Sequence, residues 1–245
     1  MKKYQPAFFL FFFFGINAFG QNSDDKAQSI QNDFQNYTRT ESSKNYSGSF
    51  LPVFYNRENT VGNRYLFNKW VTGRVVDTGN VIVSNNKFVF NYDKIAANLL
   101  ATQDRKTIIE VNLDAIRSFT LIDGEEMVTF ERNSLINKKD FVVALVESKT
   151  GYSLFKSLKT TFHKADYTNN GIFTSGKNYD EFVDEVGYYI IFPQDKEFKK
   201  IDLKGKSIKG ALANEDNKVK KYFSQNEGNG INEIFLKGLI NFLNQ

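Results

Sequence analysis

Apolar and aromatic residues recur in short runs between Gly48 and about Leu203, and small polar segments separate the runs. The runs Ile116–Ile122 and Met127–Arg132 flank the segment 123–126, whose Asp-Gly pair is a strong turn signal. Strands of this length joined by tight polar turns are typical of antiparallel hairpins. The pattern therefore predicts a hairpin here.

A second polar segment, 84–87, separates Val81–Val83 from Phe88–Phe90 and predicts another hairpin. Tyr152–Phe162 is expected to pair back on Phe141–Glu147 across a Lys-Thr-Gly turn. Further strands are predicted at Arg64–Val76, Thr107–Leu113, Tyr188–Phe192 and Phe198–Leu203.

The spacing of apolar residues changes after Leu203 and predicts three short helices in residues 207–244. The helical positions are Ile208 and Leu212, then Val219, Tyr222 and Phe223, then Ile231, Ile234, Phe235, Leu239, Phe242 and Leu243. The third helix is the most apolar and is expected to pack on the sheet. The fold class is therefore α+β, a mainly antiparallel sandwich or partial barrel at 48–203 with a small helical subdomain at 204–245.

The first 20 residues have the order of a signal peptide. Lys2 and Lys3 precede an apolar run from Ala7 to Ile16, and Ala18-Phe19-Gly20 supplies small residues for cleavage after Gly20. The run is shorter than the roughly 20 apolar residues of a membrane-spanning helix. Export to the periplasm or the extracellular space is therefore expected.

The composition of the chain limits what the predicted mature protein can contain. Residues 21–47 are polar and predict a spacer, in which positions 25–38 could form a short helix. The chain has no Cys, so lipidation of an N-terminal cysteine and disulfides are both excluded. The predicted mature chain has a net charge of +2 against +4 for the whole, so global charge indicates no class of partner.

Several short motifs occur in a fixed order along the chain. They are Trp70-x-x-Gly73-x-Val75, Leu154-Phe155-Lys156, Phe162-x-Lys164-Ala165-Asp166, Phe182-Val183, Tyr188-Tyr189-Ile190, Lys218-Val219-Lys220-Lys221-Tyr222 and Asn232-Glu233. In their order and spacing they resemble those of exported β-rich domain proteins of unknown function from Bacteroidota. The resemblance implies an envelope location and a β-rich architecture with a helical C-terminus. It implies no activity, ligand or catalytic residue.

Candidate catalytic groups are few. The one His, His163, precedes Asp166 by three residues, but no Gly-x-Ser-x-Gly motif accompanies it, which favours a structural role. Carboxylates cluster at Asp180, Glu181, Asp184 and Glu185 and again at 123–126, without the spacing of a calcium loop. The sequence thus predicts no catalytic, cofactor-binding or metal-binding residue and favours a protein that is not an enzyme.

One charged segment stands out, Lys196–Lys221, with nine lysines against four acidic residues. It contains no Arg, whose planar fork makes phosphate recognition specific, and nucleic-acid binding is not expected. The segment is interpreted as a solvated helical face. Peripheral contact of Lys218, Lys220 and Lys221 with an anionic membrane surface is the alternative.

Three functions remain open. The first is a non-catalytic cell-envelope protein that acts by contact with an unknown macromolecule. The second is a carrier or sensor of an apolar ligand held in an aromatic-lined β shell. The third is a hydrolase of envelope polymers that uses only the carboxylates Asp180, Glu181, Asp184 and Glu185.

Overall fold

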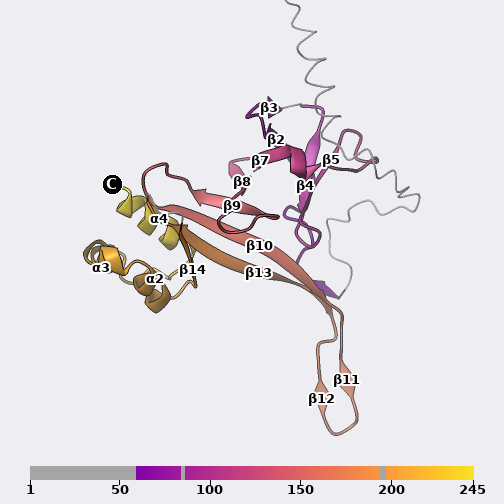
Figure 1. Cartoon of the computed structure of the whole chain (residues 1–245). Coiled ribbons are helices and arrows are strands. Elements are labelled where there is room, and N and C mark those ends of the chain that lie inside the picture. The colour runs from indigo at the N-terminus through magenta and orange to yellow at the C-terminus, as the bar shows by residue number, and fades with distance from the viewer. Residues whose placement is uncertain (1–58, 84–85, 194–196) are drawn as a thin grey trace, which may run out of the picture.

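A computed structural model describes residues 59–83, 86–193 and 197–245 (Figure 1). The predicted signal peptide and spacer lie outside the described residues. The main sheet has the order β1-β13-β10-β9-β8-β7-β2-β3, with β14 also paired to β13. Its strands are β1 (Thr60–Val61), β2 (Thr72–Asp77), β3 (Ile82–Val83), β7 (Ile116–Asp123), β8 (Glu126–Arg132), β9 (Phe141–Val146), β10 (Ser153–His163), β13 (Asp180–Ile191) and β14 (Phe198–Ile201).

A second sheet of three antiparallel strands packs on the part of the main sheet formed by β2, β7, β8 and β9. It comprises β4 (Val89–Asp93), β5 (Asn98–Thr102) and β6 (Ile109–Glu110), and the 3₁₀ turn η1 (Leu113–Ala115) leads back to β7. Tyr92, Phe119 and Phe130 are almost completely buried between the sheets, with the Tyr92 and Phe130 ring centroids 4.5 Å apart. The two sheets form an open sandwich around a first core.

The predicted hairpins have different outcomes, and the pairing of Tyr152–Phe162 with Phe141–Glu147 is confirmed as β10 with β9. The hairpin of β7 and β8 is confirmed, and Gly124 in its turn has a φ of 61°, a left-handed conformation that glycine adopts without strain. The hairpin across 84–87 is wrong, because β3 pairs with β2 in the main sheet whereas β4 pairs with β5 in the second sheet. The chain changes sheets here because β4 is buried, and its Asn91 side chain bonds to the backbone of Phe67 and Lys69.

The predicted helical C-terminus is confirmed as three α-helices with a 3₁₀ turn between the first two. They are α2 (Gly205–Ala211), η2 (Ala213–Glu215), α3 (Asp216–Gln225) and α4 (Glu233–Leu243). Their apolar faces cover the end of the main sheet where β10, β13 and β14 pair, which creates a second core. None of the described helices is long and apolar enough to cross a membrane.

Polar contacts fix the helical subdomain on the sheet. Asn232 caps α4 by accepting a hydrogen bond from the backbone N–H of Phe235. Glu233, in the first turn, accepts from Lys156 Nζ at 2.8 Å and from the Tyr188 hydroxyl at 3.0 Å. Burial, with the neighbouring Glu233 carboxylate, raises the pKa of Tyr188 to about 12, so this hydroxyl stays a donor. The contacts orient α4 across β10 and β13.

The strands β10 and β13 form the longest element of the fold. Their register is unbroken from Ser153↔Ile191 to His163↔Glu181. One end of this ribbon lies under the helical subdomain, and the other extends past the second sheet toward a projecting hairpin (Figure 1).

Candidate interaction surface at the projecting arm

Residues 164–179 form a hairpin that projects from the far end of β10 and β13 (Figure 1). We call it the arm. It contains the short strands β11 (Thr168–Asn169) and β12 (Thr174–Ser175), which are paired with each other, and the Thr168 and Ser175 hydroxyl oxygens lie 2.9 Å apart. The side chains along its length are exposed, apart from partial burial of Tyr179. The arm is thus available for contact on both sides.

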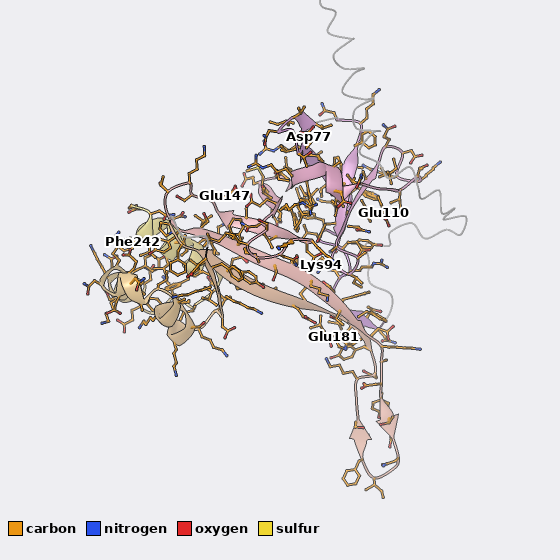
Figure 2. The ribbon with its side chains drawn as sticks, viewed as in Figure 1. Asp77, Lys94, Glu110, Glu147, Glu181 and Phe242 are labelled. Carbon is orange, nitrogen blue, oxygen red and sulfur yellow. The ribbon has the colours of Figure 1, made fainter. Side chains whose placement is uncertain are left out.

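An open cleft of about 650 Å³ lies where the arm meets the ribbon. Its lining residues are Phe162, His163, Lys164, Asp166, Gly176, Lys177, Tyr179, Glu181 and Val183. The cleft therefore joins hydrogen-bonding and charged groups of both signs to aromatic and aliphatic surface. Figure 2 shows Glu181 at this root of the arm.

The cleft is organised by contacts around Lys177. Its ammonium group pairs with the Glu181 carboxylate, and this hydrogen bond raises the pKa of Lys177. Its backbone N–H donates to Asp166 Oδ1 at 2.8 Å, and its carbonyl accepts from the N–H of Asp166 at 3.0 Å. These bonds close the base of the arm and hold its two chains together.

The structure brings His163 and Glu181 together, because they are paired residues of β10 and β13. Asp166 lies in the same cleft, where its carboxylate accepts from the Lys177 backbone. His163 is exposed, and no Ser, Thr or Cys lines the cleft, whose one hydroxyl belongs to Tyr179. The arrangement fits binding through hydrogen bonds rather than nucleophilic catalysis.

The clustered carboxylates of β13 each accept hydrogen bonds from a different residue. Asp180 accepts from the backbone N–H of Ala165 at 2.8 Å, and Glu185 accepts from the Thr161 hydroxyl at 2.8 Å. Asp184 accepts two hydrogen bonds from Lys94 Nζ, at 2.7 and 2.9 Å. Among the described residues, no three His, Asp or Glu side chains are arranged to hold a metal ion.

Lys94 connects the second sheet to the ribbon and so positions the arm root. It follows β4, its side chain is only 7% exposed, and its backbone carbonyl accepts from the N–H of Thr160 on β10. Figure 2 shows Lys94 beside the ribbon, away from the arm. This charge is part of the scaffold and not of the cleft.

The tip of the arm carries two adjacent, highly exposed apolar side chains. Ile172 is 82% exposed and Phe173 is 73% exposed, while Tyr167 lower on the arm is 51% exposed. Sequence reasoning missed this feature. The signal was present, because Asn169-Asn170-Gly171 is a turn sequence and no charged residue occurs from Tyr167 to Gly176.

The lysines proposed for anionic contact lie on α3, at the end of the molecule away from the arm (Figure 1). All three are exposed. Lys218 Nζ lies 3.5 Å from the carbonyl oxygen of Leu243, Lys220 pairs with Asp216 at 2.6 Å, and Lys221 lies over the Phe242 ring. The contacts of Lys218 and Lys221 join α3 to α4, whereas the Lys220 pair lies within α3, and all three side chains are exposed to solvent.

Comparisons of the chain with known protein families, with characterised proteins and with solved structures find no match.

Proposed function

We propose that this protein is a non-catalytic exported component of the cell envelope, and that it acts by contact with another macromolecule through the cleft at the arm root. The observation that carries the proposal is the cleft itself, which lies on a projecting element. It presents Lys164, Lys177, Asp166 and Glu181 beside aromatic surface. A polar polymer chain or an exposed protein loop offers groups that match such a mixture.

The arrangement of the aromatic residues favours a function in macromolecular contact rather than in carrying an apolar ligand. Phe119 and Phe130 stack with ring centroids 4.7 Å apart, and Phe141 lies 5.3 Å from Phe119. These rings fill the first core with one another and are not arrayed around the cleft. The carboxylates of β13 favour a contact function rather than hydrolysis. Asp180, Asp184 and Glu185 each accept hydrogen bonds from other residues of the protein.

The proposal is tested by photo-crosslinking in intact cells. A photoreactive amino acid replaces Lys164 at the cleft, and in a matched control it replaces Glu126, which is also exposed and begins β8. We expect an adduct of defined mass at position 164 that is lost when His163 and Glu181 are changed to Ala. Absence of any adduct at 164, or the same adducts at 164 and 126, would overturn the proposal.

A further inference from the structure

The tip of the arm combines exposed apolar side chains with backbone N–H groups that are paired inside the turn. Its turn presents Ile172 and Phe173, two of the three most exposed large apolar side chains among the described residues; the other is Ile234 on α4. The amides of Ile172 and Phe173 donate to Asn170 Oδ1, at 3.2 and 2.8 Å. The amide of Gly171 donates to Asn169 Oδ1 at 2.8 Å, and that of Asn170 donates to the Phe173 carbonyl at 3.3 Å.

Four successive backbone donors at the tip are therefore satisfied inside the turn. In water the gain from such pairing is modest, because water also bonds free amides, and Asn side chains make similar bonds in many aqueous turns. In a low-dielectric medium an unpaired amide costs several kcal/mol, so internal pairing is a requirement there. Gly171 has a φ of 82°, which allows the turn to close while both apolar side chains remain outside.

Polarity changes in steps along the arm. The tip turn carries the apolar Ile172 and Phe173 together with Gly171 and the polar Asn170. The adjoining positions are Thr168, Asn169, Thr174 and Ser175 with the aromatic Tyr167, and charges begin at Asp166 and Lys177. The two charged residues lie at one level, because their backbones are hydrogen-bonded to each other. The five residues from Tyr167 to Gly171 span about 15 Å if extended. This is enough for the tip to reach about 5–10 Å into the boundary between headgroups and acyl chains while Asp166 stays in water.

Charge at the arm root is nearly balanced. Lys164 and Lys177 stand against Asp166, Asp180 and Glu181, and Lys177 and Glu181 are paired with each other. A surface of this kind is neither attracted nor repelled strongly by anionic lipids. Contact by the tip would therefore depend on apolar burial.

We propose that the arm tip inserts Ile172 and Phe173 into the surface of a lipid bilayer, with Tyr167 at the headgroup level and Asp166 and Lys177 in water. The inference goes beyond the proposed function, which concerns the polar cleft at the root. Insertion of the tip leaves the cleft next to the membrane surface, open to a partner located there. Contact by the α3 lysines is a separate mechanism that requires anionic lipid.

The test uses the absence of Cys from the chain, which makes a single introduced cysteine a specific label. The full-length protein carries Ile172→Cys, or Glu126→Cys as the exposed control, each labelled with an environment-sensitive fluorophore. Vesicles are made of phosphatidylcholine alone or with phosphatidylglycerol, with and without a quencher on the acyl chains. Because both proteins share residues 1–58, a difference between the labels reports the tip.

We expect the label at 172 to shift to the blue and to be quenched from the acyl chains with both lipid compositions, at low and high salt. The label at 126 is expected to remain in water. A second pair of proteins carries the label at Thr174→Cys, one with the wild-type tip and one with Ile172→Ser and Phe173→Ser. The double serine change is expected to weaken membrane binding, measured by quenching from the acyl chains, by about 100-fold.

Three results would overturn the inference. The label at 172 could stay in water with every vesicle, or respond only when anionic lipid is present at low salt. It could also shift without lipid as protein concentration rises, which would show that the tip binds a second copy of the chain. Loss of lipid insertion together with a retained adduct at position 164 would leave the proposed function intact.

Discussion

Tyr152 and Asn244 form a two-bond clamp that joins the end of the chain to the start of β10. The Tyr152 backbone N–H donates to Asn244 Oδ1 at 2.7 Å, and Asn244 Nδ2 donates to the Tyr152 carbonyl at 2.9 Å. The side-chain amide thus occupies the place of a neighbouring strand. The preceding Gly151 leaves room for it, because a Cβ there would lie 2.3 Å from Asn244 Oδ1.

Asn244→Ala is expected to lower the free energy of unfolding by about 1–3 kcal/mol, since it leaves two partly buried backbone groups without partners. Asn244→Asp is expected to destabilise as well, because it replaces the donor with a second acceptor. Urea denaturation followed by circular dichroism measures both. Gln245→Ala is the control and is expected to unfold like the wild type; equal stability of all variants would contradict the role of the clamp.

The Lys94–Asp184 pair predicts a non-additive effect on stability. Asp184→Asn leaves the nearly buried Lys94 ammonium without its counter-charge, and we expect a loss of about 2–4 kcal/mol. Lys94→Met keeps the packed stem of the side chain and is expected to cost less. A double-mutant cycle by urea denaturation measures the coupling, and additive single effects would show that the pair contributes no specific interaction.

Glu131 and Glu147 predict a dependence of stability on pH. Burial, followed by the hydrogen bond and charge of Glu147, raises the pKa of Glu131 to about 8, whereas its ordinary value is 4.5. The folded protein therefore holds a proton that the unfolded chain releases above pH 4.5. The resulting stability is complete at low pH and is lost as the pH rises through 8.

Glu131→Gln is expected to remove this dependence and to raise the free energy of unfolding at pH 9 by about 1–2 kcal/mol, a figure reduced for partial solvent exposure. At pH 5 the variant and the wild type are expected to differ little. Urea midpoints at the two pH values measure the effect. Glu126→Gln, on the same strand and exposed, is the control; an equal response of both variants would refute the assignment to Glu131.

The α3 lysines give a prediction of cellular distribution. Lys218, Lys220 and Lys221 changed together to Gln are expected to reduce the membrane-associated fraction if α3 contacts anionic lipid. Gln avoids the repulsion from Asp216 that Glu at position 220 would create. Fractionation of cells measures the distribution, and the same change at the exposed Lys106, Lys138 and Lys149 controls for total charge. Equal partitioning of both triple variants would remove the hypothesis.

The parts of the fold that were predicted depend on local patterns. Asp123-Gly124 marks a turn through a conformation that glycine adopts easily, and the period of Phe235, Leu239 and Phe242 marks a helix. The transition from β3 to β4 follows instead from long-range contacts. Asn91 bonds to Phe67 and Lys69, which lie more than twenty positions earlier, and no neighbouring residue signals that pairing.

The sequence identified single residues of the candidate site but not how they come together. His163 and Glu181 were both noted in the sequence, but only the register of β10 and β13 makes them neighbours. The arm itself was missed, because Thr168–Asn169 and Thr174–Ser175 lack the alternation of a half-buried strand. Both faces of such a strand meet solvent, so the periodic signal that identifies other strands does not arise.

The unbroken register of β10 and β13 gives the molecule a fixed internal length. Eleven residue pairs of extended ribbon span about 35 Å. The helical subdomain holds one end of this length and the arm projects from the other. The ribbon can therefore act as a rigid spacer that sets the distance between a partner at the arm root and any surface that α3 touches. Inserting or deleting two residues in each strand keeps the facing of the side chains and would change that distance by about 7 Å.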